Sequence, residues 1–336
     1  MSTSNKDFFK RFISVPVKDK PLSGYTSSST EIIEISINEC GTRLVASRTD
    51  KSIRIWKCTS DRLLDPIIIE DAHNRSVECI SWDPKTEYTF ATVGRDECIK
   101  IWRGNTGTLE RTIKIAAGAS LKLVRYSYDG ELLLAVDRES NVYVYSAGQN
   151  YKLVNEFQVS EYVYDLRWFN SKHKFFICAL HDGTLPVYEV SEDGTESKLR
   201  TTLTGHRSSA TTVSISPRGN YIAVGASEGV VSIWDCSTML NEKVLTSIDE
   251  SVAHIDSSRD GAYVAVSYDS GSNSMVYESD SGELVYEIPN SMSGQTTFSK
   301  VCWFPNKTAF AYSSDLGTTL VYMKKSDRIG GGRKLK

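Results

Sequence analysis

The sequence predicts an all-β protein, folded as a single seven-bladed β-propeller that an N-terminal strand closes. Three observations support this fold: a strand pattern repeats along the chain, the third strand of each repeat ends in Trp or Tyr, and seven such repeats follow one another. Their spacing lies close to the ~40–45 residues of a four-stranded propeller blade. Closed all-β architectures often reach the length of this chain as one domain.

The repeats share one plan: an alternating strand, a polar turn, an apolar strand, a turn with an acidic residue, and a third strand. It is clearest in Val77–Trp102, Val163–Tyr188 and Ala210–Trp234. The third strands end at Trp56, Trp102, Tyr145, Tyr188, Trp234, Tyr277 and Tyr322, and the first strands end at Ile37, Trp82, Tyr126, Trp168, Ile215, Ser257 and Trp303. These two landmarks are always 19 or 20 residues apart, and successive terminal aromatics are 43 to 46 residues apart.

Fourth strands are predicted between the repeats, at Pro66–Glu70, Leu109–Ile115, Lys152–Phe157, Lys198–Leu203, Lys243–Ile248 and Glu283–Ile288. The last blade therefore lacks one strand. The apolar segment Phe12–Val17 is the candidate, because its pairing with the last blade closes the ring and protects the sheet edges. We expect a flexible N-terminus at residues 1–11, the propeller at residues 12–323 and a flexible basic tail at residues 324–336.

Three blades are expected to be less regular than the rest. The second turn of the first five repeats carries an acid six residues before the terminal aromatic, at Asp50, Asp96, Glu139, Asp182 and Glu228. Blade 6 has Gly271 at this position, and Asp315 of blade 7 is displaced by one residue. In blade 4, Pro186 lies within the third strand and removes a backbone donor, which predicts a bulge or weakened pairing.

Composition narrows the classes of function. With 336 residues and a formal net charge of −3, the chain has no overall charge that would draw it to nucleic acid or an anionic membrane. The longest apolar runs, Leu132–Val136 and Ile67–Ile69, are far too short to span a bilayer, and the first residues lack the apolar core of a secretory signal. Seven cysteines without a C-x-x-C pair favour reduced thiols and a cytosolic or nuclear protein.

Two repeats carry a histidine before the first strand, an acid in the second turn and a terminal Trp. The two sets are His73, Asp96 and Trp102, and then His206, Glu228 and Trp234. At these positions the chain resembles the WD-repeat family, which implies that each set forms a buried hydrogen-bonded network. A catalytic His–Asp pair is the alternative interpretation. Recurrence of the same spacing in several blades favours the structural network.

No sequence motif indicates catalysis. The chain has no G-x-G-x-x-G, P-loop, H-E-x-x-H or G-x-S-x-G pattern, and its five histidines show no metal-ligand spacing. We therefore predict no catalytic residue, no cofactor, no metal site and no enzymatic activity. The C-terminal tail is basic, with Lys324, Lys325, Arg328, Arg333, Lys334 and Lys336. It is interpreted as a solvated tail, with contact to nucleic-acid phosphates as the alternative.

A candidate docking surface lies at one rim of the propeller channel. Residues before the turn acids and on the inner strands project there in blades 2 to 4, and they are Arg95, Arg138, His181, Lys122, Tyr162 and Tyr164. Arg and Tyr are the residue types that anchor protein interfaces. The pattern predicts a site for an acidic or helical partner segment, and an ordinary solvated loop surface is the alternative.

Several segments also resemble the WD-repeat subunits of THO complexes, above all DLRWFNSKHKFFI in blade 4. The resemblance runs in blade order from about Glu31 to Tyr322. It implies a nuclear adaptor in the THO/TREX assembly, which couples transcription elongation to messenger RNA packaging and export. It also implies large helical scaffold subunits as partners and, through them, a DEAD-box helicase. RNA contact is then indirect, or weak through the tail, and no membrane is involved.

Two other functions stay open from the sequence. One is a different nuclear WD-repeat scaffold that binds histones or assists ribosome assembly. The other is a propeller that binds RNA directly through its basic tail. Both share the predicted fold, so only the identity of the bound partner separates them from a THO adaptor.

Overall fold

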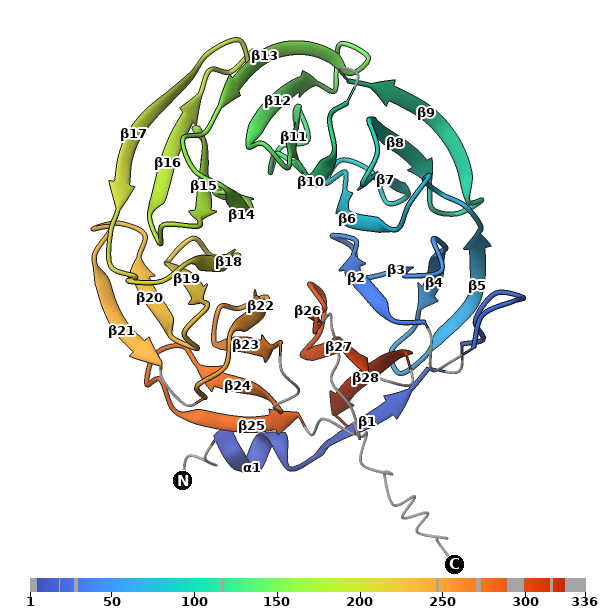
Figure 1. Ribbon diagram of the computed structural model, residues 1–336. Helices are drawn as coiled ribbons and strands as arrows, with labels where there is room; N and C mark the ends of the chain where they lie inside the picture. Colours follow the sequence, from blue (N-terminus) through green and yellow to red (C-terminus); the bar gives the residue numbers. More distant parts are fainter. Residues whose placement is uncertain are drawn as a thin grey trace, which may run out of the picture.

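The computed structural model describes residues 5–17, 19–26, 30–115, 118–245, 248–269, 273–288, 299–314 and 317–323. Within these ranges the chain forms seven four-stranded antiparallel sheets that surround a central channel (Figure 1). The predicted all-β fold, a seven-bladed β-propeller, is confirmed.

The two strands of each blade nearest the axis bury apolar residues on both faces. The innermost strands are β2 (Ile32–Ile37), β6 (Val77–Trp82), β10 (Leu121–Tyr126), β14 (Val163–Trp168), β18 (Ala210–Ile215), β22 (Val252–Ser257) and β26 (Val301–Trp303). The second strands are β3 (Arg43–Arg48), β7 (Thr89–Gly94), β11 (Leu132–Asp137), β15 (Lys174–Leu180), β19 (Tyr221–Ala226), β23 (Tyr263–Tyr268) and β27 (Ala309–Ser314).

The outer half of each blade contains the strand with the terminal aromatic and the edge strand. The third strands are β4 (Ile53–Cys58), β8 (Cys98–Arg103), β12 (Asn141–Ser146), β16 (Leu185–Val190), β20 (Val231–Asp235), β24 (Ser274–Glu278) and β28 (Gly317–Met323). The edge strands of blades 1 to 6 are β5 (Leu63–Ile69), β9 (Thr108–Lys114), β13 (Lys152–Gln158), β17 (Ser197–Leu203), β21 (Asn241–Leu245) and β25 (Leu284–Ile288). All six overlap the predicted fourth strands.

The edge strand of blade 7 comes from the other end of the chain. Strand β1 (Phe12–Pro16) pairs antiparallel with β28, from Phe12 opposite Met323 to Pro16 opposite Thr319. The two strands lie side by side in Figure 1, blue against red. This is the pairing predicted for residues 12–17, and it leaves no open gap between the first and last blades.

The N-terminal residues are more ordered than the sequence indicates. Residues 1–11 were expected to be flexible, but Asn5–Phe9 form helix α1, which lies against β25 at the outside of blade 6 (Figure 1). Phe9 is 1% exposed, and its ring centroid lies 4.9 Å from that of Tyr263 and 5.5 Å from that of Tyr286. Burial of this aromatic ring holds the helix in place.

Beyond β1, the chain is fastened to blade 1 by an ion cluster. The carboxylate of Asp19 accepts a hydrogen bond from Arg54 Nε at 2.9 Å and another from Arg48 Nη1 at 2.5 Å. Arg54 is fully buried, and its second carboxylate neighbour is Asp50 at 3.6 Å. The N-terminal segment therefore contacts blades 6, 7 and 1.

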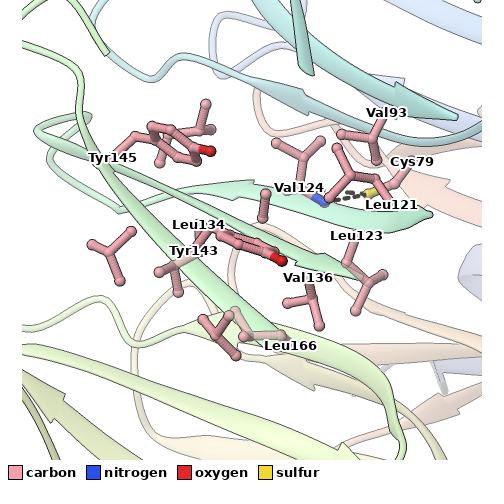
Figure 2. Packing of buried hydrophobic residues seen from close by; sticks show 14 of the residues in the cluster. Cys79, Val93, Leu121, Leu123, Val124, Leu134, Val136, Tyr143, Tyr145 and Leu166 are labelled. Carbon is pink, nitrogen blue, oxygen red and sulfur yellow. Dashed lines mark hydrogen bonds between the residues drawn. The ribbon is translucent and has the colours of Figure 1, made fainter. Parts of the chain in front are cut away.

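The core lies between neighbouring blades, where apolar faces stack. Its largest cluster joins blades 2, 3 and 4, and Figure 2 shows Val93, Val124, Leu134 and Leu166 converging from these sheets. Successive side chains of a strand point to opposite faces of the blade, and each face packs against a neighbouring blade. This stacking explains why the strands read as nearly continuous apolar runs.

Backbone irregularities recur in register. In blades 1 to 6 the pairing of the third and fourth strands shifts near the terminal aromatic, as between Val187 and Tyr188. The bulge is thus a property of the repeat rather than of Pro186. Pairing on the β15 side of Pro186 is weakened as predicted, because the register ends at Ile177 opposite Val187. Gly271 and Asp315 lie outside the described residues.

Two further findings bear on the sequence predictions. All seven cysteines are free thiols, as predicted, and Cys79 and Cys178 are buried. Among the described residues, no helix is both long and apolar enough to cross a membrane.

Candidate functional site

The predicted network of blade 2 is present and gains a member. His73 Nδ1 lies 2.9 Å from Asp96, and a carboxylate only accepts, so Nδ1 carries the proton. His73 Nε2 then accepts from the Thr92 hydroxyl at 2.8 Å, and Trp102 Nε1 donates to the same oxygen at 2.8 Å. Desolvation lowers the pKa of His73, which keeps the imidazole neutral. Sequence reasoning missed Thr92, which connects the histidine to the tryptophan.

Replacing Thr92 with Val is expected to destabilise the protein by about 2–4 kcal/mol, because Trp102 Nε1 and His73 Nε2 each lose a buried hydrogen bond. Urea unfolding measures the loss. Thr112→Val at an exposed position of β9 is the matched control and should change stability by less than about 0.5 kcal/mol. Equal effects at the two positions would contradict the network.

The blade 5 network differs from the prediction at its acid. His206 Nε2 lies 2.7 Å from Ser232 Oγ, and Trp234 Nε1 donates to that oxygen at 2.7 Å. Glu228 is exposed, and the structure gives it no hydrogen bond to His206. Ser232 bonds the imidazole directly, and Glu228 acts on His206 only through its charge, which partly opposes the lowering of the His206 pKa by burial. A hydrogen-bonded place for Glu228 in this network stays a prediction. In both sets the imidazole and the tryptophan share one hydroxyl oxygen, which is the arrangement that a structural role requires.

The rim arginines are held together by one glutamate. Glu78 of β6 accepts hydrogen bonds from Arg95 Nε and, at 2.6 Å, from Arg138 Nη2. The side chains of Arg95 and Arg138 remain 51% and 37% exposed, whereas that of Glu78 is 15% exposed. One carboxylate thus positions two guanidinium groups from blades 2 and 3 and leaves both accessible.

Lys122 lies beneath the rim rather than on it. It is 8% exposed, and its Nζ lies 3.8 Å from the centroid of the Tyr162 ring and 5.4 Å from that of Tyr164. The ammonium also donates to the backbone carbonyl of Val163. Burial and the nearby Arg138 lower the pKa of Lys122 to about 8. The sequence indicated a lysine at this position but not its enclosure by aromatic rings.

The remaining predicted rim residues form an aromatic series on blade 4. The rings of Tyr162 and Tyr164 meet edge to face with centroids 5.0 Å apart. The exposed imidazole of His181 stacks on Tyr164, with centroids 6.1 Å apart and planes inclined by 17°. These contacts restrict the rings to one arrangement, which favours binding because little rotamer freedom remains to be lost.

Four of the six predicted residues line one cavity at the channel mouth. This cavity has a volume of about 290 Å³, and its predicted lining residues are Arg95, Lys122, Arg138 and Tyr164. Tyr162 and Arg138 border a neighbouring cavity of about 390 Å³, and His181 borders neither. The structure therefore brings together the residues that the sequence predicted at one rim. We call this surface, from Arg95 to His181, the basic–aromatic rim.

An ion-pair network forms the floor of the mouth. Asp165 contacts Arg125 Nη2 at 3.3 Å and Arg167 Nη2 at 3.5 Å, and Lys300 contacts Glu34 at 3.2 Å. Below this floor the channel widens into a cavity of about 640 Å³. Sequence reasoning missed the network, although charged residues inside otherwise apolar inner strands were a usable signal.

Comparison with protein families agrees with the geometry. A model described as the WD domain, G-beta repeat, matches residues 65–103 and 197–235, which end at the third strands of blades 2 and 5. These two blades carry the histidine networks. The chain is a β-propeller with WD repeats in blades 2 and 5.

Curated relatives of this WD-repeat propeller differ in how much of their length they share with it. It is 24% identical to THO complex subunit 3 of Arabidopsis thaliana over 310 residues, which cover 90% of this chain and 92% of that protein. It is 25% identical to WD repeat-containing protein AAC3 of Dictyostelium discoideum, over 71% of this chain and 52% of that protein. A probable cytosolic Fe-S cluster assembly factor of Schizosaccharomyces pombe is 23% identical over 63% of this chain and 33% of its own length.

Two predictions about the WD-repeat propeller concern metal and nucleic acid. In the described ranges, no three His, Cys, Asp or Glu side chains are grouped so as to hold a metal ion. The basic residues Lys324, Lys325, Arg328, Arg333, Lys334 and Lys336 lie outside the described residues. Contact between this tail and nucleic acid therefore stays a prediction.

Proposed function

We propose that this chain is a non-enzymatic adaptor subunit of a THO-type complex in the nucleus. In this role it works within the TREX assembly, which couples transcription to messenger RNA packaging and export. The observation that carries the proposal is similarity to THO complex subunit 3 along nearly the whole of both chains. The similarity to AAC3 covers only about half of that relative, as expected for shared propeller repeats alone.

The proposed partners are the large helical scaffold subunits of the THO complex, and through them a DEAD-box helicase. The basic–aromatic rim supports a docking role, because accessible Arg and Tyr side chains anchor protein interfaces. A formal net charge of −3 favours a protein that contacts RNA mainly through other subunits.

Affinity purification of the full chain from nuclear extract, followed by mass spectrometry, tests this function. Co-purification of THO scaffold subunits in near-stoichiometric amounts is the expected result. Recovery of histones or pre-ribosomal particles without any THO subunit would contradict the proposal. An RNA crosslink confined to residues 324–336, again without THO subunits, would favour direct RNA binding.

Reversing both rim arginines, Arg95→Glu with Arg138→Glu, is expected to reduce recovery of the scaffold at least tenfold. The reason is that the partner then meets three clustered carboxylates, including that of Glu78, instead of two guanidinium groups. The matched control is Arg103→Glu at the end of β8 with Arg200→Glu on the edge strand β17; these two arginines are 49% and 54% exposed, and each is paired with a glutamate.

The control variant should co-purify the scaffold as the wild type does. Thermal unfolding of both variants checks that the propeller is intact. Unchanged recovery with the rim variant would exclude the rim as the docking surface.

A further inference from the structure

Charges at the channel mouth do not balance. Among the residues that the structure describes, three carboxylates line the mouth cavity, those of Glu34, Glu78 and Asp165. It is lined by five cationic side chains, and they are Arg95, Lys122, Arg125, Arg138 and Lys300. His254 adds no charge, because burial lowers its pKa well below the ordinary value. The mouth therefore has an excess of two positive charges.

The excess can be assigned to particular groups. Glu34 pairs with Lys300 at 3.2 Å, and Asp165 pairs with Arg125 at 3.3 Å and also with Arg167, which does not line this cavity. Glu78 is shared by Arg95 and Arg138, so one of these two guanidinium charges has no carboxylate of its own.

Lys122 carries the second unmatched charge, because the contacts described for its ammonium are a backbone carbonyl and two aromatic rings. In addition, Arg138 Nε is buried, and the structure gives it no hydrogen-bond partner. Both unmatched groups lie at the same cavity, and a buried cation without a counterion is costly.

We propose that the mouth receives two closely spaced carboxylates from an acidic segment of a partner protein. One carboxylate pairs with the Arg95–Arg138 fork, and the other reaches Lys122, while Tyr164 packs against the segment. This inference rests on the proposed docking role of the basic–aromatic rim and names the chemistry of what docks there. Charge-assisted bonds to guanidinium groups are the strongest polar contacts such a segment can make.

The surroundings favour a short acidic segment over a nucleic-acid strand. The neighbouring cavity, reached past Arg138 and Tyr162, is bordered by Glu139 and Glu161, both exposed. A phosphate backbone that continued from the mouth into this cavity would place its next charges beside these two carboxylates. Two carboxylates match the excess of two positive charges at the mouth, and a short segment places no further negative charge beside Glu139 and Glu161.

The affinity should depend on pH in a defined direction. Lys122 faces Glu78 on β6, Arg138 after β11, and Tyr162, Tyr164 and Asp165 at β14. The pKa of Lys122 is about 8, so it loses its proton as the pH rises through 8. A bound carboxylate favours the protonated amine, so binding takes up protons near pH 8. Affinity should fall about tenfold between pH 7 and pH 9.5.

The experiment selects peptides on the full-length chain from a random dodecapeptide display library, then measures the enriched peptide by fluorescence anisotropy. We expect enriched sequences to share two acidic residues within four positions. Changing those two residues to Gln or Asn should weaken binding at least tenfold. Arg138→Gln and Lys122→Met in the protein should each do the same, whereas Arg103→Gln at the outer end of β8 should change nothing.

Several results would overturn the inference. These are no enrichment, enrichment of peptides without acidic pairs, or binding that neither Arg138→Gln nor Lys122→Met weakens. Binding of a twelve-nucleotide polyuridine RNA that Arg138→Gln abolishes would assign the mouth to phosphate instead. Should the double arginine reversal abolish co-purification while acidic peptides do not bind, the adaptor function stands and this inference fails.

Discussion

Deleting residues 1–22 is expected to leave a propeller that unfolds or aggregates at 37 °C. The deletion removes α1, β1 and Asp19 together, so blade 7 loses its edge strand and Arg54 loses its nearest counterion. Burial of Phe9 and Phe12 contributes about 3–5 kcal/mol. Removing the Asp19 carboxylate from the buried Arg48 and Arg54 costs about 3–5 kcal/mol more. Their sum approaches the ~5–15 kcal/mol that holds a whole domain folded.

Yield of soluble protein and thermal unfolding measure the effect of the deletion. Single substitutions make the same test without removing a strand. Phe9→Ala should cost about 3–4 kcal/mol, because Phe9 is 1% exposed. Phe8→Ala, at a half-buried position one residue earlier, should cost clearly less. A truncated chain as stable as the full chain would show that closure by β1 is dispensable.

Asp165→Asn is expected to cost about 3–5 kcal/mol, because it removes the only carboxylate of the described residues within 4 Å of Arg125 or Arg167. Asp165 also accepts hydrogen bonds from the Val213 backbone at 3.2 Å and from its own neighbour Leu166 at 2.9 Å. An amide retains part of this bonding but none of the charge. Chemical denaturation against Asp249→Asn, an exposed control, measures the difference.

The loss of stability caused by Asp165→Asn should depend on pH. Burial alone would raise the pKa of Asp165, but Arg167 and Arg125 outweigh it and hold the pKa at about 2, below the ordinary 3.8. The carboxylate therefore stabilises the fold above pH ~4 and loses this effect as the pH falls through 2. The gap in stability between wild type and Asp165→Asn should be constant above pH ~5 and should narrow below pH ~4. A gap that widens in acid would refute this assignment.

The fold was predictable because each blade repeats a local pattern. An aromatic at the end of every third strand and polar residues in the first turns are visible in short windows, and β13 (Lys152–Gln158) differs from its prediction by one residue. Prediction failed where a feature depends on contacts between distant segments. Helix α1 is stabilised by Tyr263 and Tyr286, more than 250 residues away, and local pattern reasoning does not see such partners.

The rim was predictable only as a set of positions. Projection from inner strands and turns placed Arg95, Arg138 and Tyr164 on one face, because blade geometry is the same in every repeat. The pairing of side chains between blades was not predictable in this way. Glu78 accepts hydrogen bonds from both arginines, and Lys122 packs against the aromatic rings of blade 4. These contacts depend on the directions of side chains from two neighbouring sheets, which the repeat pattern does not give.

Closure by β1 also constrains the order of events during synthesis. The segment Phe12–Pro16 is synthesised before all seven blades, and its partner β28 is translated more than 300 residues later. Until β28 is made, the side chains of β1 have no sheet to join, so the nascent chain carries an unpaired strand while blades 1 to 6 are synthesised. We therefore expect chaperones that bind extended apolar segments to bind the nascent chain before the propeller closes. A chain whose translation stops before blade 7 should aggregate through the unpaired β1 segment.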